Sequence, residues 1–369
     1  MKQGWEIKTV GAICDIKTGR LDANAASENG AYPFFTCSQA PLRIDNYAYD
    51  CECVLVAGNG ELNAKYYNGK FNAYQRTYII TTKSEYKNIS VKYLYKFFSK
   101  YIEQLRQLSI GGVIKYIKLG NLTDATLPIP PREEQERIVE ELDCLSGIIE
   151  RKREQLKELD ALAQSIFYQM FGDPITNEKG WEVKCLRDIS TIGTGATPSR
   201  EKEELYYGGE IHWVKTTEVQ NCDIHSTEET ITKLAVEQTN CKVYPQNTLL
   251  MAMYGQGKTR GQIARLKISA ATNQACAAIM LAEARCILDF IYELLLIKYE
   301  SIRAMAKGGN QANLNLKIVG SIPIILPPLA LQQEFADKIE AIEKQKELIK
   351  KSISETETLI NARMDYYFN

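Results

Sequence analysis

The sequence lacks the features that mark several large classes of protein. It contains only two histidines, and its ten cysteines form no Cys-x-x-Cys pair, the spacing typical of structural zinc sites. No stretch approaches the roughly 18 to 20 apolar residues that a membrane helix needs. The first residues also lack the apolar core of a secretory signal peptide. We therefore expect a cytoplasmic chain with reduced thiols, no membrane segment and no metal site.

Signatures of catalysis are missing too. A DNA methyltransferase should carry an Asn/Asp-Pro-Pro-aromatic motif, and none is present. The run Gly257-Lys258-Thr259 resembles the end of a phosphate-binding loop, but Ala252 stands where that loop needs its first glycine. The only histidines, His212 and His225, do not combine with nearby cysteines at a zinc-finger spacing. The sequence thus predicts no catalytic residue and no cofactor bound by this chain.

The chain also has no strong net charge, since it contains 45 Lys and Arg and 46 Asp and Glu. The distribution is uneven. Residues 1–131 are net basic and residues 172–326 are neutral, whereas the acidic excess lies in residues 132–171 and 327–369. Such a distribution permits contact with DNA phosphates outside the acidic segments, but does not require it.

What the chain does contain is an internal duplication. Gly4-Trp5-Glu6-Ile7-Lys8 returns as Gly180-Trp181-Glu182-Val183-Lys184. Three later motifs return 197 residues further on: a Gly-x-Gly at Gly58, a Gly-Gly at Gly111 and a Pro-Pro at Pro130. A repeat of this size indicates a duplicated domain, because solenoid repeats are much shorter. Two diverged copies suggest one kind of task performed at two places.

After each Pro-Pro pair, apolar residues recur every three or four positions for more than four heptads, a pattern typical of a long helix. Proline favours the start of such a helix, and Gly172-Asp173-Pro174 would end the first one. Two unrelated surface helices would also show this pattern. We instead expect an antiparallel pair, about 60 Å long for forty residues, that acts as a rigid spacer. The residues expected to pack between the helices are Ile138, Leu142, Leu145, Ile149, Leu156, Leu159, Phe335, Ile339, Ile342, Ile349, Ile353 and Ile360.

The remaining sequence has the pattern of two similar domains of mixed α/β structure. Short apolar runs such as Cys53–Ala57 and Thr248–Met253 predict buried strands, and Val91–Leu108 and Leu288–Ile302 predict helices. The expected fold class is α+β: two similar mixed α/β domains and two long antiparallel coiled-coil helices, related by a pseudo-twofold duplication. The predicted boundaries are 1–128, 129–172, 173–326 and 327–369.

The ordered duplicate resembles the specificity subunit of Type I restriction-modification systems. Leu127-Pro128-Ile129-Pro130-Pro131-Arg132-Glu133-Glu134-Gln135 and its counterpart at Ile322–Glu334 carry the resemblance, which extends over the whole chain. It implies that 1–128 and 173–326 are target recognition domains, each reading half of a split, asymmetric sequence of double-stranded DNA. It also implies that the helices dock two modification (methyltransferase) subunits, with restriction subunits that translocate and cleave. S-adenosylmethionine, ATP and Mg²⁺ would be bound by those partners, and this subunit would not be catalytic.

The loops that follow buried strands are the candidate DNA contacts. Glycine lets the backbone approach closely, Lys and Arg suit phosphate or guanine, and Asn and Gln suit adenine. These loops could equally be ordinary exposed connections between strands. The candidates are Asn59, Asn63, Lys65, Tyr67, Gln75, Arg76, Lys115, Lys215, Thr216, Gln256, Lys258, Thr259, Arg260, Gln262, Asn310, Gln311 and Asn313.

Two alternatives remain open from the sequence. The near-neutral charge allows a scaffold whose helices bind partners while the α/β halves bind protein or a small ligand. A DNA-recognition subunit of a methylation-only or other phage-defence complex fits the same residues. Salt-sensitive binding to duplex DNA would separate the scaffold from the DNA-reading proteins.

Overall fold

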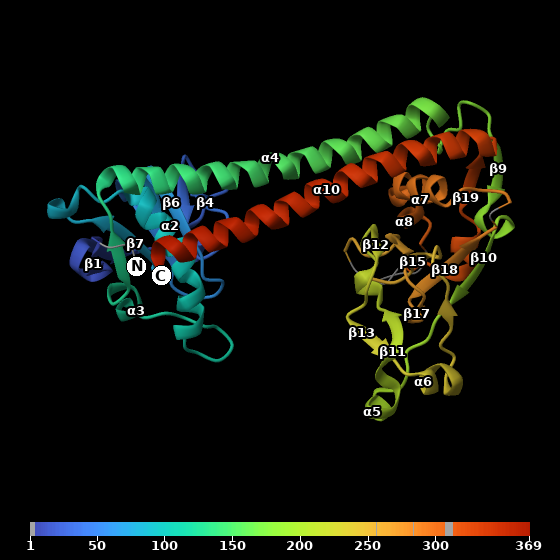
Figure 1. Ribbon diagram of the computed structural model, residues 1–369, viewed down its shortest axis with the longest axis horizontal. Coiled ribbons are helices and arrows are strands. Elements are labelled where there is room, and N and C mark those ends of the chain that lie inside the picture. Colours follow the sequence, from blue (N-terminus) through green and yellow to red (C-terminus); the bar gives the residue numbers. More distant parts are fainter. Residues whose placement is uncertain (1–3, 256, 283, 307–312) are drawn as a thin grey trace. The chain divides into compact units, whose positions relative to one another are not determined.

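The computed structural model describes residues 4–255, 257–282, 284–306 and 313–369. The chain forms two compact units (Figure 1): unit 1 comprises residues 1–154 and 349–369, and unit 2 comprises residues 155–348. Each unit therefore contains one globular domain and about half of each long helix. Among the described residues, no helix is both long enough and apolar enough to cross a membrane.

Unit 1 is built on a six-stranded sheet with the order β2-β7-β5-β6-β3-β4. The long central strands β5 and β6 pair antiparallel, as do β5 and β7. The apolar face of α2 packs on β5 and β6 through buried residues such as Tyr93, Leu94 and Phe98. The elements are α1 (Val10–Ile13), β2 (Cys14–Thr18), β3 (Tyr32–Phe35), β4 (Leu42–Ile44), β5 (Tyr49–Ala57), β6 (Ala64–Ala73), β7 (Thr77–Thr82), α2 (Val91–Leu108) and α3 (Leu119–Thr123).

The two larger sheets of unit 2 have the orders β10-β18-β15-β16-β12 and β13-β11-β17-β14. Strand β15 is buried along its whole length, as its run of apolar residues predicts. The strands are β10 (Ser190–Thr194), β11 (Tyr207–Val214), β12 (Cys222–Ile224), β13 (Glu229–Ile231), β14 (Val243–Tyr244), β15 (Leu249–Ala252), β16 (Ile263–Leu266), β17 (Ala270–Thr272) and β18 (Cys276–Leu281). The helices are α5 (Glu203–Tyr206), α6 (Lys233–Gln238), α7 (Leu288–Ile297), α8 (Tyr299–Ala304) and α9 (Leu316–Gly320).

The repeated Gly-Trp-Glu motif begins a short strand in each unit, and that strand pairs with the one before the Pro-Pro pair. In unit 1, β1 (Glu6–Thr9) pairs antiparallel with β8 (Thr126–Ile129). In unit 2, β9 (Glu182–Cys185) pairs in the same way with β19 (Pro323–Leu326). The beginning and end of each globular domain are thus joined where the long helix starts.

The long helices are α4 (Arg132–Phe171) and α10 (Leu329–Phe368), each of 40 residues. Both begin directly after the Pro-Pro pair, and α4 ends at Gly172, whose φ of +75° is the left-handed conformation that favours glycine. The two helices pack together with opposite directions, since Lys152 of α4 donates a hydrogen bond to Ser352 of α10 and Lys346 of α10 pairs with Asp160 of α4 at 2.7 Å. All twelve residues expected between the helices are buried or half-buried.

The C-terminal end of α4 packs into the globular domain of unit 2, and the C-terminal end of α10 packs into the globular domain of unit 1. In unit 2, Phe167 and Phe171 of α4 meet Phe290 of α7 and Phe335 of α10, with Phe171 and Phe290 ring centroids 4.9 Å apart. Their equivalents 197 residues away in unit 1 are Met364 and Phe368 of α10, Tyr93 of α2 and Ile138 of α4, which share one apolar core. In both copies, therefore, the apolar core of the globular domain includes the C-terminal end of the long helix that belongs to the other copy.

Most of the elements expected from the sequence are present, and the fold class is confirmed. The helix expected over Leu288–Ile302 differs, because it breaks at Lys298 into α7 and α8. The buried ammonium of Lys298 donates a hydrogen bond to the Pro174 carbonyl at 3.3 Å, a contact from a segment 124 residues away that local periodicity cannot reveal.

Candidate nucleic-acid interface

Four segments meet at one end of the unit 1 sheet, and we call them loop cluster 1: residues 36–40, 58–63, 74–76 and 109–118. The Gly58 N–H donates to the Arg76 carbonyl at 2.8 Å, which joins the second segment to the third. The Gly60 N–H donates to the Lys115 carbonyl at 2.9 Å, and the Ile117 N–H donates to the Gly58 carbonyl at 2.9 Å. The Gly-x-Gly and Gly-Gly motifs, far apart in sequence, are therefore neighbours.

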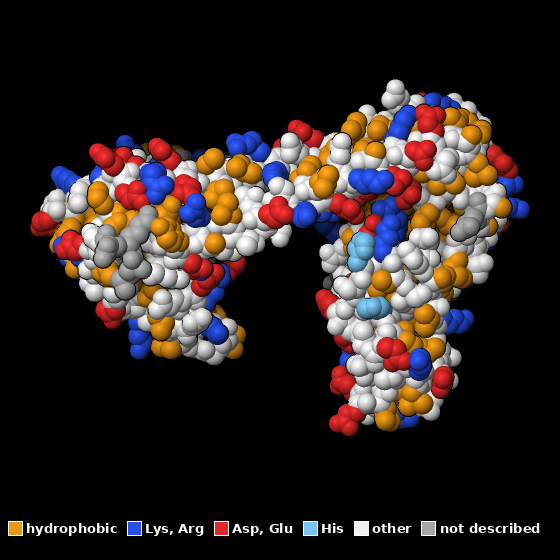
Figure 2. All heavy atoms as spheres, in the orientation of Figure 1, with side chains coloured by type: hydrophobic (Ala, Val, Ile, Leu, Met, Phe, Trp, Pro, Cys, Tyr) orange, Lys and Arg blue, Asp and Glu red, His pale blue; other side chains and the backbone are white. Residues whose placement is uncertain are grey.

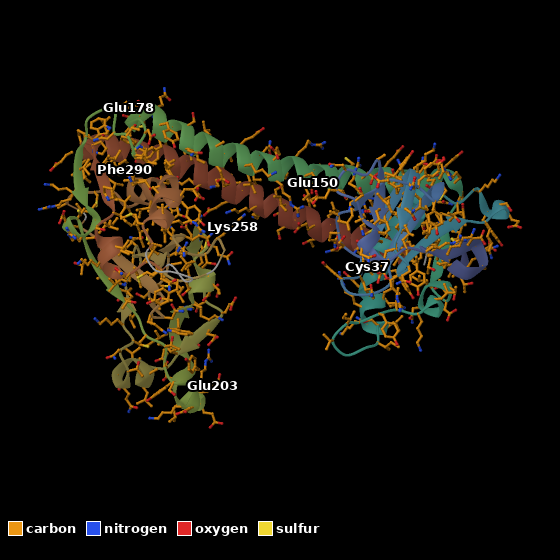
Figure 3. All side chains as sticks on the ribbon, turned by 180° about the vertical axis from the view of Figure 1, so that it is seen from behind. Cys37, Glu150, Glu178, Glu203, Lys258 and Phe290 are labelled. Carbon is orange, nitrogen blue, oxygen red and sulfur yellow. The ribbon has the colours of Figure 1, made fainter. Side chains whose placement is uncertain are left out.

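A small polar network fixes these segments from within. The Asn63 side chain is buried, and its amide nitrogen donates to the carbonyls of Cys37 and Glu61, both at 2.8 Å. The Cys37 thiol (labelled in Figure 3) donates to Asn59 Oδ1 at 2.9 Å and lies 3.6 Å from the Arg76 carbonyl. A buried amide with all these partners holds the loops in place rather than presenting itself to a ligand.

Two other candidates on β6 are also engaged within the protein. The half-buried Lys65 ammonium donates to Asn63 Oδ1, and burial lowers the pKa of this lysine. The half-buried Tyr67 ring packs against Phe35 at a centroid distance of 5.0 Å and against Phe71 at 5.6 Å. Lys65 therefore supports loop cluster 1 through Asn63, and Tyr67 packs within the sheet.

The remaining candidates of unit 1 have exposed side chains. Gln75 and Arg76 lie on the turn between β6 and β7, and Lys115 lies on the loop between α2 and α3. This loop is at the end of unit 1 opposite α4 (Figures 1 and 3). An amide and two cations in exposed, hydrogen-bonded loops are groups that can reach base edges and phosphates.

Unit 2 has a comparable set of segments, which we call loop cluster 2. It comprises residues 195–197, 214–217, 253–255, 257–261, 273–276 and 313–315. The Met253 N–H donates to the Ala275 carbonyl at 2.8 Å, and the Leu314 N–H donates to the Met253 carbonyl at 3.0 Å. Leu314 is the counterpart of Ile117, 197 residues earlier, and in both copies the N–H of this residue donates to the carbonyl of the first residue after the central strand. Asn273 accepts from the Thr216 hydroxyl at 2.9 Å, and Gln274 accepts from the Thr197 hydroxyl at 2.6 Å.

The candidates of unit 2 differ in exposure. Lys258 (labelled in Figure 3) is exposed, whereas Thr259, Arg260, Gln262 and Asn313 are half-buried. The Lys258 carbonyl accepts from the Tyr299 hydroxyl, and the Arg260 carbonyl accepts from Arg303 at 3.1 Å, so α8 fixes this loop. Three further candidates lie outside the described residues, namely Gln256, Asn310 and Gln311.

Lys215 is bound to carboxylates, at 2.6 Å from Glu228 and 3.1 Å from Glu229. These contacts raise its pKa and offset its charge. Its neighbour Thr216 is held by Asn273. Figure 2 shows Lys and Arg interspersed with Asp and Glu over the visible face of each unit, as the near-neutral composition predicts. Among the described residues, the visible face of each unit therefore carries no broad basic patch.

Several residues of the clusters are not marked by any sequence motif. Cys37 and Thr197 follow strands, and their role depends on contacts with residues 22 and 77 positions away. Val113 and Ile114 are apolar, and so they are not among the Lys, Arg, Asn and Gln candidates. Their place after a Gly-Gly pair in an exposed loop, where apolar residues are uncommon, is the sequence signal that marks them.

His212 and Cys241 of unit 2 make ordinary internal contacts. His212 Nδ1 lies 3.1 Å from the Thr227 hydroxyl, and the Cys241 thiol donates to the Ala196 carbonyl at 3.2 Å. Within the part of the chain that the structure describes, no group of three or more His, Cys, Asp or Glu side chains could hold a metal ion.

The family model for the Type I restriction modification DNA specificity domain matches residues 2–160 and again residues 178–358. The chain belongs to this family. The two matches coincide with the two copies of the duplication, so each globular domain and the long helix after it form one family unit.

Similar proteins include the Type I restriction enzyme EcoDI specificity subunit of Escherichia coli, 39% identical over 155 residues, which are 42% of this chain and 34% of that protein. The MjaIX specificity subunit of Methanocaldococcus jannaschii is 26% identical over 289 residues, which are 71% of this chain and 66% of that protein. The match therefore spans about one third of the first relative and just under two thirds of the second.

The fold is also shared with a solved specificity-family structure. The crystal structure of the Type I restriction-modification S subunit from M. genitalium superposes with a TM-score of 0.60 at 16% identity, covering 99% of this chain and 96% of that one. At this identity the likeness concerns the fold: two mixed α/β domains and a pair of long helices packed together.

Proposed function

We propose that this chain is the DNA-specificity subunit of a Type I restriction-modification complex and that each loop cluster reads one half of a split, asymmetric target. The observation that carries the proposal is the double family match together with the repeated loop frame. Both units bring equivalent loops together, but place different side chains on them. A shared frame with diverged side chains suits two half-sites of different sequence, because identical readers would recognise a palindrome.

We propose in addition that the long helices fix the separation between the two half-sites. Successive major-groove half-sites on one face of DNA lie roughly 34–36 Å apart. Two continuous helices of 40 residues, packed along an apolar seam, suit a spacer that sets such a distance. This role favours a DNA reader over a scaffold that only collects partners.

The partners follow from the same proposal. Two modification subunits would dock on the helices and methylate adenine with S-adenosylmethionine, and restriction subunits would use ATP and Mg²⁺ in the cytoplasm of a prokaryote. This chain would contribute recognition and no catalytic group. Because the chain as a whole is nearly neutral in charge, many phosphate contacts would come from the modification subunits.

Methylation mapping tests the proposal directly. The chain is expressed with its neighbouring modification subunit in a host that lacks adenine methylation, and methylated adenines are located by long-read sequencing. A split asymmetric motif should be found only when this chain is present. An assembled complex that produces no methylated motif would contradict the proposal.

A double substitution assigns one half-site to unit 2. Lys258→Ala with Arg260→Ala should relax or abolish the half-site read by loop cluster 2, while the other half-site and assembly with the modification subunit persist. Lys233→Ala, an exposed lysine on α6 outside the cluster, serves as the control. Unchanged methylation of native sites by the double variant would remove these two residues from the assignment.

A further inference from the structure

The loop between α2 and α3 of unit 1 forms a small hairpin with an apolar tip, and backbone hydrogen bonds hold this hairpin in place. Ile110 and Tyr116 exchange two backbone hydrogen bonds, at 3.0 and 2.8 Å, and so close a small hairpin over residues 110–116. Gly111 turns the chain at a φ of +118°, a conformation that side chains disfavour. The bond from the Gly60 N–H to the Lys115 carbonyl then fixes the hairpin to loop cluster 1.

The tip presents apolar side chains to solvent. Val113 is fully exposed, and Ile114 is 62% exposed. β-branched residues at a solvent-facing tip gain nothing from folding, since their apolar surface stays in water. Here they stand side by side on a fixed backbone, and this arrangement suits a contact made with another molecule.

The surroundings of the tip indicate a nucleic acid as that molecule. The exposed cations Lys115, Lys118 and Arg76 belong to the same loop cluster, and Arg106 borders it through a hydrogen bond to the Leu62 carbonyl at 3.4 Å. Glu61 is the one acidic residue within the four segments of loop cluster 1. An apolar tip bordered by cations is complementary to a DNA groove, where apolar groups of the bases lie between the two phosphate backbones.

The internal duplication indicates that this position sets specificity. In the second copy, the four residues after the Gly-Gly pair are Asn310, Gln311, Ala312 and Asn313, where the first copy has Val113, Ile114, Lys115 and Tyr116. The residues that follow, Ile117 and Leu314, are equivalent, and the N–H of each donates to the loop after the central strand of its unit. The bond made by the residue after this segment is therefore kept in both copies, while the sequence of the segment changes from apolar to amide residues. Amides pair with adenine, and apolar side chains contact the methyl group of thymine.

We propose that Val113 and Ile114 read thymine methyl groups in the major groove of the half-site recognised by unit 1. This inference rests on the proposed function and names the base feature that one loop cluster recognises. A half-site methylated on adenine contains at least one A·T pair, so a thymine methyl is available there. Insertion of the same side chains between stacked base pairs would be a different mode of contact, and the uracil substitutions described next distinguish it.

The test removes the methyl group from the DNA and the apolar group from the protein. The complex of this chain with its modification subunit is titrated with target duplexes in which single thymines are replaced by deoxyuridine, at fixed salt. Wild-type binding should weaken about fourfold for each contacted methyl that is removed, the effect of exposing roughly one methyl group, and only in one half-site. Val113→Ala with Ile114→Ala should bind the thymine and uracil duplexes equally. Ile7→Ala, an exposed apolar residue on β1 outside the cluster, should behave as wild type.

A second variant asks whether the tip sets the base preference. Val113→Asn with Ile114→Gln gives the tip of unit 1 the side chains of the second copy. Its methylation motif should change at positions of one half-site and keep the other half-site. Thermal unfolding of the complex should match wild type, because both residues are exposed.

The outcomes separate this inference from the proposed function. Specific target binding that is indifferent to uracil in both half-sites would overturn the inference and leave the function intact. Weak binding by the alanine variant, combined with wild-type binding that ignores uracil, would also overturn it, because base-pair insertion predicts that result. A complex without any sequence-specific binding would overturn both.

Discussion

Two buried glutamines join the start of each long helix to the adjacent globular domain. Gln135 of α4 accepts from the Ser90 N–H at the start of α2 (2.8 Å) and donates to the Pro130 carbonyl (2.9 Å). Gln332 of α10 accepts from the Ile287 N–H at the start of α7 (2.9 Å) and donates to its own Pro-Pro pair (2.8 Å). In both copies, one side-chain amide thus accepts from an N–H at the start of one helix and donates to a carbonyl just before the start of another.

Replacing either glutamine by alanine should therefore cost about 2–3 kcal/mol of unfolding free energy, because two buried backbone groups lose their partners. Denaturant unfolding monitored for Gln135→Ala and Gln332→Ala gives the values. The neighbouring Gln333 is exposed, and Gln333→Ala should change stability by no more than about 0.5 kcal/mol. Equal effects of Gln332→Ala and Gln333→Ala would show that the buried contacts are not important for stability.

Glu293 of α7 should make the stability of unit 2 depend on pH. Burial raises the pKa of its carboxyl to about 7, against the opposing attraction of Arg265 and Lys346; Glu343 and Asp289 add repulsion. The folded state therefore keeps a proton that the unfolded state releases above its ordinary value of 4.5, and stability should fall as pH rises from about 4.5 to 7. The fall should be at most about 3 kcal/mol, and should level off above pH 7.

Glu293→Gln keeps the shape of the side chain and removes the titration. The variant should be about as stable as wild type near pH 5 and more stable at pH 8, as measured by thermal unfolding over this range. Glu300→Gln, at an exposed position on α8, should follow the wild-type profile. Parallel pH profiles for wild type and Glu293→Gln would contradict the assignment.

At the scale of elements, the C-terminal end of α4 is a structural part of unit 2. Phe167 is fully buried against Phe171, Phe290 and Phe335. Phe167→Ala should cost about 3–5 kcal/mol, because it leaves a large cavity among aromatic rings. Tyr168→Ala, at the next and half-exposed position, should cost far less. Hydrogen exchange should show the loss of protection within residues 155–348, and uniform loss in both units would argue against this anchoring.

The elements also show what the sequence could and could not predict. Helix α2 has the bounds that the periodicity of Val91–Leu108 predicts, since its apolar face packs on a sheet of the same domain. The stripe on α4 predicted a packed helix, but not that its end completes the other domain, because periodicity gives a face and not its partner. Likewise Asn63 has the composition and position of a base reader, yet contacts with residue 37 bury it. The exposed loop positions of residues such as Arg76 and Lys258 could be predicted from the sequence, because local sequence motifs mark these loops.

At the scale of the whole molecule, the duplication makes the helix pair a candidate ruler between half-sites. Residues 151–157 of α4 and 348–354 of α10 are equivalent by the 197-residue offset and lie where the helices contact each other, as the bond from Lys152 to Ser352 shows. Deleting both segments removes one heptad from each helix and keeps the apolar stripe in register. Each helix becomes about 10 Å shorter, which corresponds to roughly three base pairs of DNA.

If the helices set the separation, the complex carrying both deletions should methylate a motif with unchanged half-sites and a spacer that is shorter by about three base pairs. Long-read methylation mapping gives both quantities from one sample. Deleting residues 151–157 alone is the matched control, because it shifts one apolar stripe against the other and should reduce assembly and stability rather than redefine the spacer. A double deletion that assembles and methylates with the original spacer would show that the modification subunits, and not these helices, fix the distance between half-sites.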